Sequence, residues 1–311
     1  MNLVGVAIST WRRPDDLRRC LKLLFAQDHP FDLFVVDNCS EDGTVDVLEE
    51  FDIDYQVMPH SNFSAIHTIN LALRELSNDY IIILDDDTFL EDPTIISKLV
   101  KTANTDSNIA IVATNVRDHL GRVSLILKTL KFDAVDYKDV SNEEFYDIDD
   151  FSGACALFRR ELVGPTYYDE SFKIYWNEPE LAIRMVAAGH RVVINQRAVV
   201  VHGSDIGRES CRSFYFGSRN TFRLMTKVLP RKSSLILSFV MIPLHFKRYL
   251  RLRNDKNFYR FLTKIMYSYV QNMYRCIFAE RIRFNDMIVY KRVCNTYTKY
   301  FLKEIFMALE I

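Results

Sequence analysis

The sequence predicts an α/β protein with a mostly parallel, doubly wound central sheet, helices on both faces of that sheet, and a helical appendage at the C-terminus. Short apolar runs alternate with helical segments through the first 113 residues, and this alternation builds a parallel sheet. Polar clusters follow the first, second and fourth runs, where the carboxyl ends of parallel strands place ligand sites. After Pro230 the chain becomes basic and aromatic, and 231–311 contains no glycine.

The first half supplies five strands, expected at 4–8, 33–36, 53–58, 80–84 and 109–113. The first helix opens at Pro14, a residue that suits the first helical position, and places its apolar side chains on one face. Further helices follow the turn-forming segment 37–43, the third strand and Pro93.

The pattern weakens beyond residue 114. We expect a strand or hairpin at 123–131, an acidic loop at 147–150, a strand at 151–158, a helix at 180–188 that ends at Gly189, and short strands at 191–195 and 198–201. The α/β domain is therefore expected to cover 1–226, and a basic, aromatic-rich helical region 227–311.

Charge is divided unevenly between these two parts. The formal net charge is −1, which suggests no nucleic-acid partner. However, 227–311 carries 17 Lys and Arg against 5 Asp and Glu, whereas 1–226 carries 23 against 36. The basic part either meets an anionic surface or neutralises the acidic part across an interface.

Six cysteines are present without a CxxC pair, so neither a zinc site nor a disulfide framework is indicated. The N-terminal residues read as a first strand and not as a signal peptide. The longest apolar stretch, 235–246, is too short to span a bilayer. These features predict a cytoplasmic protein.

Three consecutive carboxylates follow the fully apolar fourth strand. Alternation along the strand puts Asp85 and Asp87 on one side and Asp86 on the other. Carboxylates this close repel one another without a cation, and oxygen ligands suit Mg²⁺ or Mn²⁺, which in turn bind phosphate oxygens. The triplet predicts a nucleotide or phosphate site, although phosphatases and solvated loops share the pattern.

Two other segments are candidates for the same site. His202 directly follows the apolar run 198–201 and is either a metal ligand or an ordinary structural histidine. Trp176, Glu178 and Glu180 precede the helix at 181–188. Acids at this place either cap the helix or supply a general base, and the tryptophan suits stacking on a sugar ring.

Six stretches resemble, in order, an inverting glycosyltransferase of family 2 with the GT-A fold, of the rhamnosyl- and galactosyltransferase-like kind. They are VAISTWRRP at 6–14, VVDNCSEDGT at 35–44, LDDD at 84–87, FSGACALFRR at 151–160, NEPELAIRMVAAGHR at 177–191, and VHG at 201–203. The resemblance covers roughly 3–225. It implies a GT-A, Rossmann-like fold and a metal-dependent transfer, with Mn²⁺ or Mg²⁺ as cofactor.

The resemblance also implies a role for each matching residue. Asp37 would hydrogen-bond the base of the nucleotide, and Gly153 with Ala154 would leave room for the sugar. The metal would be held by Asp87 and His202, with Asp85 beside it. The nucleotide-sugar site would comprise Thr10, Arg12, Asp37, Asp85, Asp86, Gly153, Ala154, Trp176, Arg208 and Arg212.

One departure concerns the catalytic position. The family usually has Glu-Asp there, with the aspartate as base, whereas this sequence has Asn177-Glu178. Glu178 is therefore the expected base, one methylene longer than usual. Glu180 is the second candidate.

The expected function is transfer of a sugar from a UDP- or dTDP-sugar to a hydroxyl of a glycan or lipid-linked glycan in a growing surface glycan. Rhamnosyl, galactosyl and galactofuranosyl donors all remain open. A non-catalytic nucleotide-sugar or glycan-binding protein is the alternative that the altered Asn177-Glu178 pair favours. A nucleotidyltransferase is a third reading, which the lack of glycine in 9–14 disfavours.

The C-terminal region carries an apolar face over 235–252, followed by basic residues. This combination suits a helix that lies in a membrane interface. Packing on the catalytic domain or a homodimer contact is the alternative. In the first case the protein would be peripheral on the inner face of the cell membrane.

Overall fold

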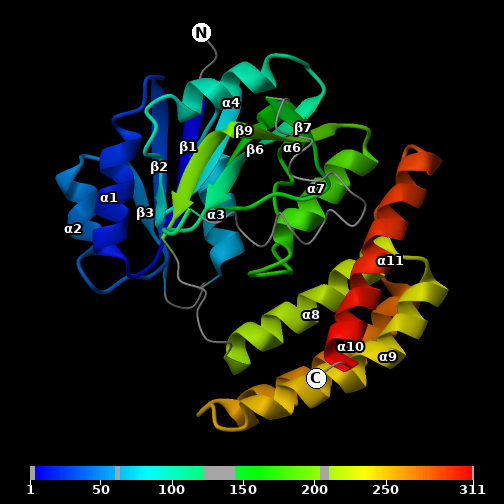
Figure 1. The fold of residues 1–311 in the computed structure, drawn as a ribbon. Coiled ribbons are helices and arrows are strands. Elements are labelled where there is room, and N and C mark those ends of the chain that lie inside the picture. Colours follow the sequence, from blue (N-terminus) through cyan, green and yellow to red (C-terminus); the bar gives the residue numbers. More distant parts are fainter. Residues whose placement is uncertain (1–3, 60–63, 122–143, 204–209, 310–311) are drawn as a thin grey trace.

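A computed structural model describes residues 4–59, 64–121, 144–203 and 210–309 (Figure 1). The predicted strand or hairpin at 123–131 and the predicted site residue Arg208 lie outside these ranges. Among the described helices, none is both long and apolar enough to cross a membrane.

The core of the molecule is one mixed sheet with the order β3-β2-β1-β4-β8-β6-β9-β5, and β7 pairs with β9 beside this path. Strands β1 to β4 are mutually parallel, β6 and β9 run the same way, and β5, β7 and β8 oppose them. The strands are β1 Val4–Thr10, β2 Phe31–Asp37, β3 Tyr55–Val57, β4 Tyr80–Asp85, β5 Thr88–Phe89, β6 Ile109–Arg117, β7 Phe145–Asp147, β8 Cys155–Arg159 and β9 Arg191–His202.

Helices cover both faces of this sheet, as predicted (Figure 1). Strand β4 explains why, because its side chains alternate between two apolar cores. Ile82 and Leu84 belong to the core with α1, α2 and α4, whereas Ile81 and Ile83 belong to the core with α3 and α7. The helices are α1 Pro14–Leu24, α2 Thr44–Glu50, α3 Ala65–Glu75, α4 Ile95–Ala103, α6 Arg160–Val163 and α7 Asn177–Ala187.

The C-terminal region is helical, as predicted, and its helices pack on the second core. Tyr249, Phe261 and Tyr297 are buried in the same cluster as the α3 and α7 side chains. The predicted boundary at 226/227 falls inside α8, so the helical bundle begins earlier than the composition suggested. Its members are α8 Cys211–Val228, α9 Arg231–Tyr249, the short 3₁₀ helix η3 Leu250–Leu252, α10 Phe258–Phe278 and α11 Met287–Leu309.

Two strand predictions were wrong in detail. The strand expected from residue 151 begins only at Cys155, because 151–154 is a loop in which the Asp150 carboxylate accepts from the Phe151 amide. The two short strands expected at 191–195 and 198–201 are one strand, β9, with a shift in register after Asn195. The Asn195 side chain accepts from the amides of Arg197 and Ala198 and so stabilises the irregularity.

Candidate active site

Two carboxylates and a histidine meet at the carboxyl end of β4. The ladder between β5 and β9 pairs Thr88 with His202 and brings that histidine to the end of β4. The His202 Nε2 atom lies 3.1 Å from Asp87 Oδ1 and 3.6 Å from Asp85 Oδ2. One ligand atom from each of the three lies within 4.8 Å of the others. The arrangement agrees with the predicted alternation, since Asp86 points elsewhere.

The electrostatics of this cluster fit a divalent cation. Burial disfavours a charged imidazole, but the two carboxylates outweigh it and raise the pKa of His202 to about 10. The pair of aspartates therefore holds a positive charge between them. Carboxylate oxygens with one imidazole nitrogen form a donor set that suits Mn²⁺, and Mg²⁺ with more of the ligands supplied by water.

Arg13 also reaches this cluster, which the sequence reasoning missed. Its guanidinium forms an ion pair with Asp87 and lies 3.8 Å from Asp86. Arg12, the predicted contact, is exposed and pairs with Glu41 at 3.3 Å. The two arginines are adjacent in the sequence but point to different partners, and the backbone between them is left-handed at Arg12, with φ of 56°.

Asp86 holds the loop that follows β1. Its carboxylate accepts from the Thr10 hydroxyl at 2.7 Å and from the Trp11 amide at 3.3 Å. Burial raises the pKa of Asp86 to about 7. Asp86 and Thr10 thus fix the loop at the edge of the site, while Asp85 and Asp87 form the charged cluster with His202.

Asp37 lies at the end of β2, opposite Thr10 in the β1–β2 ladder. It is fully buried, and its Oδ2 atom accepts from the Ser40 amide at 2.9 Å. No described residue donates a hydrogen bond to its Oδ1 atom. A buried carboxylate oxygen without a donor is costly, so a ligand that brings an N–H group would be favoured here.

Glu178 lies in the first turn of α7, against the loop that carries Gly153 and Ala154. A Cβ atom on Gly153 would stand 2.4 Å from Glu178 Oε1, so any other residue at 153 would have to displace the Glu178 carboxylate. The Ala154 carbonyl accepts from the Asp85 amide at 2.9 Å and ties the same loop to the acidic cluster. Burial raises the pKa of Glu178 to about 7, and the negative charge of Asp85 adds to the shift.

Two further residues beside Glu178 were not predicted as site residues. Asp150 is buried, and burial together with the charge of Glu178 raises its pKa well above the usual range. The Tyr168 hydroxyl is buried without a hydrogen-bond partner among the described residues, and Glu178 and Asp85 are among the charges that raise its pKa. The sequence showed Asp150 only as part of an acidic loop, and Tyr168 gave no signal.

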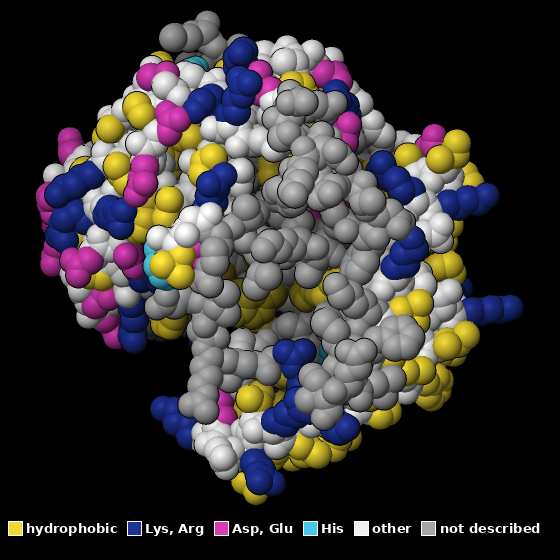
Figure 2. All heavy atoms as spheres, in the orientation of Figure 1, with side chains coloured by type: hydrophobic (Ala, Val, Ile, Leu, Met, Phe, Trp, Pro, Cys, Tyr) yellow, Lys and Arg dark blue, Asp and Glu magenta, His cyan; other side chains and the backbone are white. Residues whose placement is uncertain are grey.

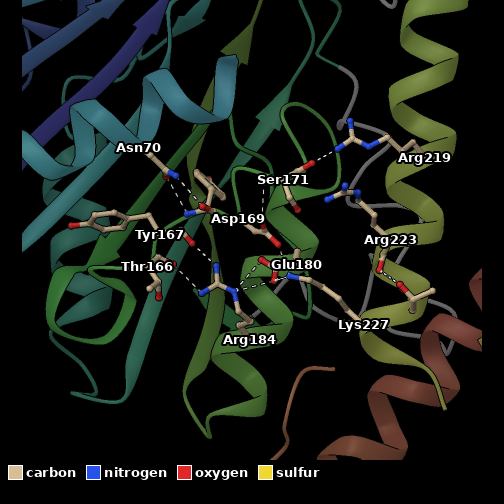
Figure 3. A network of polar contacts seen from close by, with 12 residues as sticks. Asn70, Thr166, Tyr167, Asp169, Ser171, Glu180, Arg184, Arg219, Arg223 and Lys227 are labelled. Atoms are coloured by element: carbon tan, nitrogen blue, oxygen red, sulfur yellow. Dashed lines mark hydrogen bonds and ion pairs between the residues drawn. The ribbon is translucent and has the colours of Figure 1, made fainter. Parts of the chain in front are cut away.

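Glu180 has a different environment from Glu178 (Figure 3). It is fully buried, and its carboxylate forms ion pairs with Lys227 at 2.7 Å and Arg184 at 3.0 Å. Arg184 in turn donates to the carbonyls of Thr166 and Tyr167. Both oxygens of Glu180 are therefore engaged in a network that joins α7 to α8.

The remaining predicted residues lie at the margins of this arrangement. Trp176 precedes α7 with a left-handed backbone, φ of 65°, and packs edge-to-face on Tyr300 of α11, with ring centroids 5.4 Å apart. Arg212 is exposed in the first turn of α8. Neither residue contacts Glu178 or the aspartates through a hydrogen bond or ion pair among those the structure describes.

The family model described as glycosyl transferase family 2 matches residues 5–164. No curated protein sequence matches the chain significantly.

Solved structures share the fold. The chain is similar to the mannosyltransferase PcManGT from Pyrobaculum calidifontis in complex with GDP-Man and Mn²⁺, with a TM-score of 0.54 and 15% identity over 97% of this chain and 86% of that one. It is also similar to TarS 1-349 from S. aureus, with a TM-score of 0.55 and 14% identity over 73% of this chain and 64% of that one. The same protein in complex with UDP-GlcNAc gives a TM-score of 0.52 and 16% identity, over 70% and 65% of the two chains. At these identities the likeness establishes the GT-A architecture alone.

Proposed function

Because the chain belongs to glycosyl transferase family 2, we propose that it transfers a sugar, with inversion, from a UDP- or dTDP-sugar to a hydroxyl of a glycan acceptor. One observation carries the assignment of the site. A partly buried glutamate with a pKa near 7, Glu178, lies beside a glycine gap and a cluster of two carboxylates and a histidine.

Glu178 is the proposed general base. A base with a pKa near the working pH is ionised often enough to accept a proton and basic enough to hold it. Its carboxylate takes the proton of the acceptor hydroxyl, and the acceptor oxygen attacks the anomeric carbon. The bond from that carbon to the phosphate oxygen breaks on the opposite side, and its electron pair leaves with the nucleoside diphosphate.

Gly153 and Ala154 are proposed to border the sugar. Because Gly153 has no side chain, there is room for the Glu178 carboxylate in its observed position. The hydrogen bond between the Asp85 amide and the Ala154 carbonyl fixes this loop relative to the metal ligands. The Glu178 carboxylate, the sugar and the diphosphate would then be held in one line. Such alignment of the reacting groups is the main contribution of a rigid site to the rate.

Asp37 is proposed to recognise the base of the nucleotide. Its Oδ1 atom has no donor among the described residues, and uracil and thymine each carry an imide N–H that would supply one. Two solved complexes of proteins with this fold hold GDP-Man and UDP-GlcNAc. Guanine also carries an N–H in its ring, so a GDP-sugar is the necessary comparison in any binding test.

Asp85, Asp87 and His202 are proposed to hold Mn²⁺ or Mg²⁺. When bound, the cation supplies positive charge to the diphosphate as it leaves, a contribution of several kcal/mol. For its part, the chain keeps the three side chains together through the β5–β9 pairing and the buried Asp87. Arg13 would exchange its ion pair with Asp87 for contact with the phosphates.

A thermal-shift screen of nucleotide sugars with Mn²⁺ tests the donor assignment. UDP- and dTDP-sugars are expected to raise the melting temperature, and GDP-mannose is not. Asp37→Asn should weaken UDP binding about 10-fold, because one acceptor is replaced by a donor that faces the base. Nucleotide release that depends on an added acceptor then separates an enzyme from a binding protein. Equal stabilisation by all donors would contradict the role of Asp37.

A further inference from the structure

A cavity of about 700 Å³ lies between α8, α10 and the loop that contains Asp169 and Ser171. None of the residues proposed for the sugar donor or the base lines it. Its polar wall includes Arg223, Lys227 and Arg275. This cavity is therefore separate from the site at the carboxyl end of the sheet.

The basic side chains around this cavity differ in whether they form ion pairs with acidic side chains. Lys227 forms ion pairs with Asp169 at 2.6 Å and with Glu180 at 2.7 Å. Within the described part of the chain, by contrast, no acidic side chain forms an ion pair with Arg223 or Arg275. Glu280 also lines the cavity but is exposed, and it forms no ion pair with a described residue.

Arg219 adds a third guanidinium to the same place. One of its terminal nitrogens donates to the Ser171 carbonyl, while its Nε atom is buried without a partner among the described residues. Figure 3 shows Arg219 and Arg223 projecting from α8 toward the loop that carries Asp169 and Ser171. Burial and the charges of Arg219 and Arg275 lower the pKa of Arg223 to about 10. Three guanidinium groups thus repel one another in a partly buried space, and an anion between them would remove that cost.

The other wall of the cavity is apolar. Tyr267, Val270, Tyr274 and Phe278 line it from one face of α10, because their spacing of three, four and four residues keeps them on one side of a helix. Each of these side chains is more than 60% exposed. In the view of Figure 2, apolar and basic side chains lie together over the helical C-terminal part of the molecule, with few acidic ones among them. Asp169 offsets part of the positive charge, but Arg223 and Arg275 have no ion-pair partner among the described residues. A row of large exposed apolar side chains beside these arginines suits a ligand that is both anionic and apolar.

We propose that this cavity binds the phosphate group of an anionic lipid. The guanidinium groups of Arg223 and Arg275 hold the phosphate oxygens, and the exposed face of α10 receives the hydrocarbon chain. The inference goes beyond sugar transfer, since no step of that reaction uses these residues. It also has a structural link to the site, because Lys227 joins the cavity to Glu180 on α7, the helix that carries Glu178.

Vesicle binding by the full chain tests the proposal with a matched pair of variants. Phosphatidylcholine vesicles with and without phosphatidic acid are sedimented with the protein. Arg223→Gln with Arg275→Gln should weaken binding to the anionic vesicles about 100-fold, because two charge-assisted phosphate contacts are lost. Arg251→Gln with Arg253→Gln removes the same charge from an exposed segment outside the cavity and should weaken binding only about fivefold. Equal losses in both double variants would overturn the proposal and indicate general surface electrostatics.

Soluble probes distinguish a lipid from a free anion. In calorimetry, dihexanoyl phosphatidic acid should bind more tightly than inorganic phosphate, and Val270→Ser with Tyr274→Ser should remove that difference. Inorganic phosphate that binds as tightly as the lipid would overturn the proposal. UDP binding by Arg223→Gln should be unchanged and its melting temperature should not fall, because the substitution relieves repulsion. These readouts do not depend on sugar transfer, so they succeed or fail independently of the proposed enzyme activity.

Discussion

The sheet region and the C-terminal helices handle charge in opposite ways. At the carboxyl edge of the sheet four carboxyl groups gather: Asp85 is exposed, Glu178 is partly buried, and Asp87 and Asp150 are buried. Around the cavity between α8 and α10, it is arginines that crowd together. Each cluster is costly alone and would be stabilised by a ligand of opposite charge. The two regions therefore differ in the ligand proposed for each, a cation at the sheet edge and an anion in the cavity.

The two glutamates of α7 show the same contrast within a single turn. Glu180 faces the helical region, where Lys227 and Arg184 neutralise it. Glu178 faces the sheet edge, where Asp85 and Asp150 are its charged neighbours. Neighbouring side chains on one helix therefore divide into a structural ion pair and a group that is basic enough to accept a proton.

Glu178→Gln should have the largest effect and tests this division directly. Loss of the general base is expected to slow transfer about 10²–10⁴-fold, while UDP binding with Mn²⁺ persists. The matched variant Glu180→Gln should leave the base in place but break a buried ion pair, which lowers the free energy of unfolding by about 1–3 kcal/mol. Steady-state transfer rates and thermal unfolding of both variants provide the measurement. A Glu178→Gln variant that transfers at the normal rate would remove the contrast.

Removal of the metal comes next in expected size. EDTA should abolish measurable transfer, and Mn²⁺ or Mg²⁺ added in excess should restore it, because several kcal/mol of charge stabilisation depends on the cation. His202→Ala should require more metal for the same rate. The control is vesicle binding by the full chain through its helical region, which EDTA should leave unchanged. Full activity in EDTA would mean that transfer does not require a cation bound to the aspartates.

Gly153→Ala tests how closely the loop and Glu178 are matched. The added Cβ would lie 2.4 Å from Glu178 Oε1, and the end of a flexible side chain is the part that moves. A displacement of about 1 Å at the reacting group can slow an enzyme about 10²-fold. We expect kcat to fall by up to that factor with little change in melting temperature. An unchanged kcat would place the reacting carboxylate elsewhere.

The pH dependence follows from the same carboxylate. Because the pKa of Glu178 is raised to about 7, it is largely protonated below that value and cannot accept a proton. The rate should therefore fall about 10-fold for each pH unit below 7 and level off above it. The ionised form is disfavoured in the folded state, so Glu178→Gln should be more stable than the original protein above pH 7. A flat profile between pH 5 and 8 would contradict the assignment.

The sequence predicted the sheet better than the site. Strand–helix alternation and one fully apolar strand were sufficient for a doubly wound sheet, since β4 has to face two cores. Side chains alternate along a strand, so the sequence also predicted that Asp86 points away from Asp85 and Asp87. The position of β8 between β4 and β6 could not be predicted, because nothing in the pattern of a single strand specifies its neighbour.

Within the site, the sequence could not choose between neighbours. Arg12 and Arg13 have the same side chain, and only the folded chain shows that Arg13 meets Asp87 while Arg12 pairs with Glu41. Glu178 and Glu180 both begin the same helix, and only the packing of α8 pairs Glu180 with Lys227. The cavity between α8 and α10 was also beyond reach, because its arginines come from helices that are distant in sequence.

Gly217→Ala should give the smallest effect. It makes in the helical region the same substitution that Gly153→Ala makes at the sheet edge. Gly217 lies inside α8, and no described atom beyond its own helical neighbourhood comes within 4 Å of an added Cβ. Alanine is favoured over glycine in a helix by about 1 kcal/mol, so the melting temperature should rise by about 2 °C while transfer is unchanged. Urea unfolding and the transfer rate, measured beside Gly153→Ala, complete the comparison. If alanine at 217 slowed transfer as much as alanine at 153, the chemistry would extend into the helices, and the contrast between a catalytic edge and a lipid-facing bundle would fail.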